Sequence, residues 1–151
     1  MTAEPERGAA YPKVGEVFEL TLDGDAPENQ PLEMIESFGY NPAGWSHNGP
    51  TVSGKQTRRF KLVEVGYCST IEKVKAKAET EGTFAEGQWI NAFKAAYPEP
   101  DGQGPIGVPD DSWINSGGRA NYPYILAFGL MQFNYAGHVR GEDWRWLVSV
   151  V

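Results

Sequence analysis

The side chains in this sequence that could carry out chemistry are few and far apart. His47 lies in a segment rich in glycine and asparagine, Cys68 is the single cysteine, and Asp110 is followed directly by Asp111. A cysteine thiol activated by an imidazole base can act as a nucleophile, and two carboxyl groups can act as acid and base. A small hydrolase-like enzyme is therefore one hypothesis, with either the histidine and the cysteine or the two aspartates as its catalytic groups.

The same aspartates raise the question of a metal ion. Asp101, Asp110 and Asp111 could offer carboxylate oxygens to Ca²⁺. Their spacing does not match the alternating acidic positions and distal glutamate of an EF-hand loop. The single cysteine excludes an internal disulfide and any multi-cysteine zinc site. The sequence predicts no metal site and no cofactor, and it leaves calcium binding by the aspartate-containing loop open.

The densest group of side chains suited to recognition is aromatic and lies near the C-terminus. Eight of the nineteen aromatic residues fall in the last forty positions, where polar residues such as Gln132 and Asn134 alternate with them. Aromatic side chains flanked by hydrogen-bonding groups are typical of surfaces that bind other molecules. We expect a non-enzymatic binding module for a protein or a glycan. Its expected binding residues are the aromatic and polar side chains Tyr122, Tyr124, Phe133, Tyr135, His138, Arg140 and Trp144.

The charge of the chain is negative and unevenly distributed. The first fifty residues contain nine acidic and two basic side chains, which alone account for the formal net charge of −7. This acidity argues against duplex nucleic acid as a partner, because such binding depends on neutralising phosphates. It allows a third hypothesis, in which the chain is an acidic inhibitor or nucleic-acid mimic that binds a basic protein.

One basic cluster, residues 55–61, contrasts with this acidity. On a strand its charges would fall on both faces, which favours an edge strand that discourages aggregation over a contact with nucleic-acid phosphates. The chain has no apolar run near the roughly 18 residues of a membrane span. Residues 1–12 also lack the apolar core of a signal peptide. We therefore expect a cytoplasmic protein with no membrane contact, and the oligomeric state stays open.

Hydrophobic periodicity indicates which elements would position these residues. Alternation of apolar and polar residues predicts strands at 16–22, 55–65, 124–128, 131–135 and 144–150. A short helix is expected at 31–38, and capping boxes at 69–72 and 83–86 each predict the start of a further helix. In the last strand, Trp146, Val148 and Val150 would face the core.

These elements predict a single α+β domain at residues 14–151, preceded by a flexible N-terminal tail at 1–13. The expected architecture is a mainly antiparallel sheet of about five strands, packed by two capped helices and wrapped by long irregular loops.

Two resemblances accompany this reading. The segments 98–107, 111–113 and 144–148 resemble those of small uncharacterised bacterial proteins of unknown function. The order of the expected elements is similar to that of C-type-lectin-like domains: an early strand, two helices, a long irregular region, and C-terminal strands with tryptophans. The chain lacks that family's cysteines and its sugar-binding Glu-Pro-Asn and Trp-Asn-Asp triplets. The resemblance therefore concerns the fold and not calcium-dependent sugar binding.

Overall fold

The computed structural model describes residues 10–137 and 142–150. In chain order, their elements are β1 (Phe18–Asp23), the 3-10 helix η1 (Pro27–Asn29), α1 (Pro31–Ser37), β2 (Ser46–His47), β3 (Lys55–Val63), α2 (Ile71–Ala78), α3 (Trp89–Ala96), β4 (Ile106–Gly107), β5 (Trp113–Ile114), β6 (Ala120–Ile125), β7 (Met131–Tyr135) and β8 (Arg145–Val150). Helices and strands are combined in one unit, which confirms the predicted α+β class. Tyr11, placed in the expected tail, is buried against Phe93 and Tyr97.

The eight strands form one mixed sheet. Its order is β1-β3-β8-β4-β6-β5-β2, and β7 pairs with β6 outside this path. β4 runs parallel to β8, whereas the other pairs are antiparallel. The expectation of about five strands was too low, because β2, β4 and β5 contain two residues each and lie in segments that read as loops. Two residues are too few to produce an alternating pattern.

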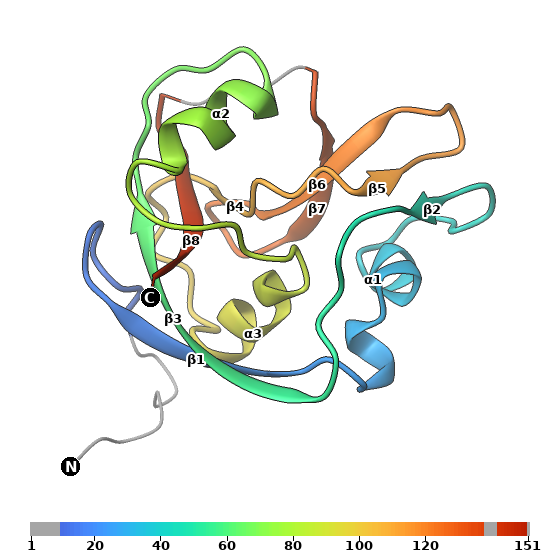
Figure 1. Ribbon diagram of the computed structural model, residues 1–151, viewed down its shortest axis with the longest axis horizontal. Helices are drawn as coiled ribbons and strands as arrows, with labels where there is room; N and C mark the ends of the chain where they lie inside the picture. Colours follow the sequence, from blue (N-terminus) through green and yellow to red (C-terminus); the bar gives the residue numbers. More distant parts are fainter. Residues whose placement is uncertain (1–9, 138–141, 151) are drawn as a thin grey trace.

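Helices cover both faces of this sheet, and each covered face has its own hydrophobic cluster. One cluster includes Ile35 of α1 and Trp89 and Phe93 of α3, and the other includes Ile71 and Val74 of α2. Figure 1 shows α3 inside the curve formed by β1 and β3, and α2 away from it, above β8 in this view. Because side chains alternate along a strand, a strand between the two clusters is buried on both sides, as β8 is over its first five residues.

The basic segment 55–61 is an edge over only part of its length, which corrects the prediction. β3 lies between β1 and β8, but β8 pairs only with residues 59–63, so, among the described residues, 55–58 pair with β1 alone. On the exposed face of this pair, Glu19 is opposite Arg59 and Asp23 is opposite Lys55. Opposite charges facing each other across strands stabilise the pair. The basic residues of β3 therefore complement acidic residues of the N-terminal third.

Of the two predicted capping boxes, one is displaced by a residue and the other is absent. α2 is capped by Thr70, whose hydroxyl accepts from the N–H of Lys73 at 3.4 Å. At the second box, the N–H and hydroxyl of Thr83 instead donate to the carbonyl of Ser149, at 2.7 and 3.2 Å. α3 begins six residues later, at Trp89. The hydroxyl of Thr83 therefore does not cap a helix, because it is bonded to β8.

Candidate functional site

The aromatic residues expected to form a binding surface are mostly inside the protein. Tyr122 is 0% exposed, and Phe133 and Trp144 are each 7% exposed. Tyr124 is half-buried, whereas Tyr135 is 39% exposed. The expectation that these five side chains share an exposed surface is therefore corrected. The other two expected binding residues, His138 and Arg140, lie outside the described residues.

The two covered faces of the sheet divide these aromatics into separate groups. On the α2 side, the ring of Trp144 lies 4.9 Å from that of Tyr124 and 5.1 Å from that of Trp146. On the other face, Phe133 packs 5.2 Å from Trp113. The expected core positions Trp146 and Val148 are 0% and 3% exposed, which confirms them, whereas Val150, the third expected core residue, is half-buried.

The polar residues between the aromatics are hydrogen-bonded within the protein. Nδ2 of Asn134 donates to the hydroxyl of Tyr122 at 2.9 Å, and the hydroxyl of Tyr124 bonds to Oε1 of Gln132 at 2.6 Å. Each bond joins residues that face each other across β6 and β7. Burial also raises the pKa of Tyr122, so its hydroxyl stays neutral at physiological pH. These side chains fasten two strands together, which occupies the groups that were expected to meet a ligand.

The structure does not bring together the residues of the hydrolase hypothesis. Cys68 is buried in the cluster beneath α2, whereas the ring of His47 packs edge-on against Trp113, 4.5 Å away, on the far side of the sheet. Asp110 is 1% exposed. Its carboxylate accepts from the N–H of Gly87 at 2.7 Å and from the hydroxyl of Ser112.

Asp111 has a different partner from Asp110: it forms an ion pair with Lys75 of α2 at 2.6 Å. Burial raises the pKa of Asp110, although its hydrogen bonds and the charge of Lys75 oppose this shift. The two carboxylates therefore tie one loop to two other segments, Asp110 to the residues before α3 and Asp111 to α2.

The burial of His47 can be tested through the pKa of its imidazole. Burial lowers the pKa of His47 below 6.5, and its Nε2 atom has no hydrogen-bond partner among the described residues. We expect an NMR titration of its ring protons to give a midpoint below 6.5. Because the unfolded chain binds this proton more readily, folding stability should decrease as the pH falls below 6.5 toward the folded-state pKa. A His47→Gln variant identifies the signals, and a midpoint at or above 6.5 contradicts the prediction.

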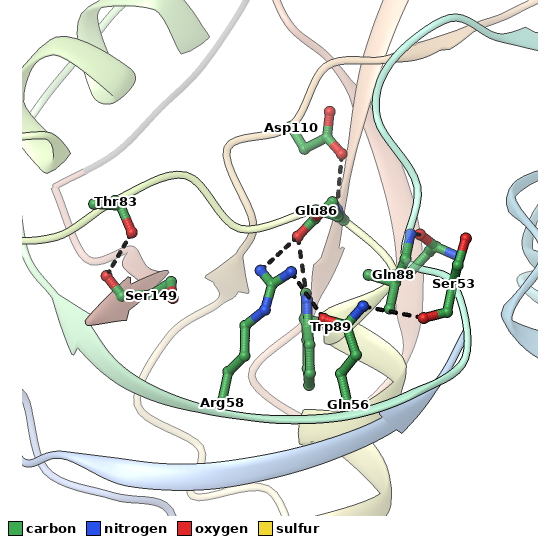
Figure 2. Close-up of polar contacts among 11 residues, drawn as sticks. Ser53, Gln56, Arg58, Thr83, Glu86, Gln88, Trp89, Asp110 and Ser149 are labelled. Atoms are coloured by element: carbon green, nitrogen blue, oxygen red, sulfur yellow. Dashed lines mark hydrogen bonds and ion pairs between the residues drawn. The ribbon is translucent and has the colours of Figure 1, made fainter. Parts of the chain in front are cut away.

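A polar cluster around Glu86 connects the segment before α3 to β3 (Figure 2). Nη1 of Arg58 and Nε1 of Trp89 both donate to one oxygen of Glu86, at 2.9 and 3.3 Å. The guanidinium of Arg58 lies 5.3 Å from the centroid of the Trp89 ring and also donates to Gln56 at 3.0 Å. Arg58 and Glu86 are paired with each other and partly covered. The cluster therefore links β3 to the segment before α3 and leaves few groups free to bind a ligand.

A pocket of about 270 Å³ with several apolar lining residues lies between α2 and β8 and is called here the α2–β8 pocket. Its deep walls are Ala78 and Val148, each 3% exposed, and Phe84 stands at its mouth, 44% exposed. The segment that carries Phe84 is held beside β8 by the bridge between Thr83 and Ser149, visible in Figure 2. The remaining lining residues are Lys75, Glu79, Gly82, Thr83 and Pro109.

This pocket is apolar inside and charged at its edge. The charge of Lys75 is neutralised by Asp111, and the hydroxyl of Thr83 donates to the Ser149 carbonyl. The exposed carboxylate of Glu79 is therefore the one unpaired charge among the described lining residues. The volume is slightly below the roughly 300–1,000 Å³ of pockets that hold drug-sized ligands. It suits one apolar side chain with a positive or polar neighbour.

Sequence reasoning missed this pocket because its walls come from four segments. α2 contributes Lys75 and Ala78, and the other walls are the 82–84 segment, Pro109 and Val148. No local pattern links these positions. The one available signal was an apolar residue, Phe84, in a stretch that was read as the first turn of a helix.

No protein-family model, curated protein or solved structure matches the chain. The resemblance to C-type-lectin-like domains therefore stays a prediction. None of the helices in the described part of the chain has both the length and the apolar character needed to cross a bilayer. Within residues 10–137 and 142–150, no three of the histidine, cysteine, aspartate and glutamate side chains gather in a way that could hold a metal ion.

Proposed function

We propose that this chain is a non-enzymatic module that binds a partner protein by receiving one apolar side chain in the α2–β8 pocket. The observation that carries the proposal is the apolar pocket with the exposed Phe84 at its mouth. A buried anchor side chain in a well-packed pocket, surrounded by weaker contacts, is how protein interfaces concentrate their binding energy. This proposal keeps the binding module expected from the sequence, but it places the binding surface at α2 and β8 instead of at the C-terminal aromatics.

A protein ligand is favoured over a glycan at this pocket. The hydroxyl groups of a sugar need hydrogen-bonding partners, and the pocket has few left to offer, because Lys75 and Thr83 are already engaged. Its inner walls are methyl groups and a proline ring. The exposed carboxylate of Glu79 adds a preference for a basic residue beside the apolar anchor.

Three small probes test this proposal by NMR. We expect N-acetyl-leucine methylamide and N-acetyl-phenylalanine methylamide to bind with millimolar dissociation constants, because one apolar side chain buries little area. The chemical-shift changes should be confined to Ala78, Thr83, Phe84 and their neighbours. Glucose, offered at the same concentration, should produce no such changes.

Variants on α2 provide the controls. Ala78→Leu adds a branched side chain at the pocket wall and should weaken binding of both amides at least tenfold, whereas Glu72→Gln, on the solvent side of the same helix, should bind as the unaltered protein does. If Ala78→Leu binds the amides equally well, or if glucose gives the larger shifts at this pocket, the proposal is wrong.

A further inference from the structure

Within the part of the chain that the structure describes, the edge strand β1 has one hydrogen-bonded neighbour, β3. The N–H of Gly24 donates to Gly54 at 2.8 Å, immediately beyond the last pair of the ladder, Asp23 with Lys55. In an antiparallel ladder, hydrogen-bonded and non-hydrogen-bonded pairs alternate. The backbone groups of Glu19 and Thr21 therefore point away from β3, toward the outer edge of the sheet.

These outward groups have no backbone partner among the described residues. Residues 18–22 make no backbone hydrogen bond outside the β1–β3 ladder. The outer edge is closed only at its end, where the carbonyl of Asp23 accepts from the N–H of Ala26 at 3.2 Å and from Nδ2 of Asn29 at 2.9 Å. Glu19 and Thr21 thus offer two N–H and two carbonyl groups, which is the template that a further strand needs.

A groove of about 350 Å³ lies along this end of β1. β1 contributes Thr21, Leu22 and Asp23 to its walls. On the other side are α3 and the segment around η1, which contribute Glu28, Asn29, Asn91, Ala92, Lys94 and Ala95, with Ser37 of α1. Extended peptides can bind to an exposed edge strand by adding a strand to the sheet, and neighbouring pockets then select their side chains.

Acidic residues near the outer edge of β1 favour a basic segment as its partner. Asp23 and Glu28 line the groove with one cation, Lys94, and Asp25, on the adjoining turn, is exposed. Lysine or arginine side chains on an incoming strand would find carboxylates, whereas acidic side chains would meet repulsion. Glu19 is opposite Arg59 and Asp23 is opposite Lys55 in β3, so the carboxylates without a basic residue opposite them are those of Asp25 and Glu28, just beyond this end of the strand.

We infer that the outer edge of β1 binds an extended, basic segment of a partner protein, which adds to the sheet as a strand beside α3. This surface is separate from the α2–β8 pocket, so the inference stands whether or not the proposed function holds. Backbone hydrogen bonds to Glu19 and Thr21 supply the pairing, and the acidic groove supplies the preference for basic side chains.

The test uses an acetylated and amidated hexapeptide of alternating lysine and valine. In the NMR spectrum of the full chain, we expect shift changes along β1 and α3, and slower amide exchange at Glu19 and Thr21 when the peptide is bound. N-methylation of the alternate peptide residues that face β1 should weaken binding at least tenfold, and methylation of the other set should leave it unchanged. A peptide with glutamate in place of lysine should bind at least tenfold more weakly.

Two variants of one residue complete the design. Thr21→Pro removes an outward N–H, which edge strands tolerate, and should abolish peptide binding; Thr21→Val keeps that N–H and should bind normally. If Thr21→Pro does not fold, the pair of N-methylated peptides gives the same answer. Equal binding by the two methylated peptides, or by the lysine and glutamate peptides, would overturn the inference. So would self-association of the chain that Thr21→Pro abolishes, because the occupant would then be a second copy.

Discussion

Replacing Trp113 with alanine is expected to lower the free energy of unfolding by about 3–5 kcal/mol, the range for large aromatic residues removed from a core. Trp113 is 0% exposed. Its ring lies 5.2 Å from that of Phe133, and Nε1 donates to the carbonyl of Pro31 at 2.8 Å. The variant therefore loses the packing of the ring and the hydrogen bond from the indole to α1. Urea unfolding followed by fluorescence and circular dichroism measures the change.

The control comes from another aromatic residue of the same C-terminal region. Phe128 is 71% exposed, so Phe128→Ala should change the free energy of unfolding by no more than about 0.5 kcal/mol, as substitutions at such surface positions do. Gly87 adds a second check, because a Cβ atom at this position would collide with the Trp113 ring; Gly87→Ala should also destabilise. If Trp113→Ala and Phe128→Ala have equal effects, the packing described here is wrong.

Replacing Arg145 with methionine should also be strongly destabilising, by about 2–4 kcal/mol. Arg145 is 6% exposed, and its guanidinium donates to both carboxylate oxygens of Asp101, at 2.6 and 2.9 Å, and to the carbonyl of Gly104 at 2.9 Å. Removing one partner of a buried ion pair costs about 3–5 kcal/mol. We expect a somewhat smaller loss because the Asp101 side chain is 23% exposed and can regain water.

The control for charge is Arg59→Met, on the exposed face of β3, which should change stability by no more than about 1 kcal/mol. The dependence on pH gives an independent check. Burial opposes ionisation of Asp101, but its hydrogen bonds and the charge of Arg145 outweigh this and lower its pKa below 3.8. The stabilisation is thus present above pH 3.8 and lost as the pH falls through the folded-state pKa. The difference between the unaltered protein and Arg145→Met should shrink below pH 3.8; a constant difference contradicts the assignment.

Several elements follow directly from the order of residues. Phe18, Leu20 and Leu22 alternate with exposed residues in β1 as the pattern indicates, and Trp89 and Phe93 share the buried face of α3. In both cases the period of the apolar residues matches the geometry of one element, strand or helix. Such patterns need no knowledge of distant contacts, so the sequence was sufficient to predict them.

Other features depend on segments that are distant along the chain. β4 contains two residues, and its place in the sheet depends on pairing with both β6 and β8. The hydroxyl of Thr83 had a local use as a helix cap, but the carbonyl of Ser149 is its acceptor. The energy of a local cap is only about 1 kcal/mol, so a contact made by the rest of the fold can displace it.

Composition and period are properties of the order of residues, so they were enough to predict an α+β chain with an aromatic C-terminal region. Which of these aromatics meet solvent depends instead on contacts between distant segments. Tyr122 and Trp144 are buried because α2 covers the sheet face that they share, and Phe133 is buried because the opposite face is covered too. The α2–β8 pocket and the open edge of β1 were decided in the same way, since each exists only where separate segments come together.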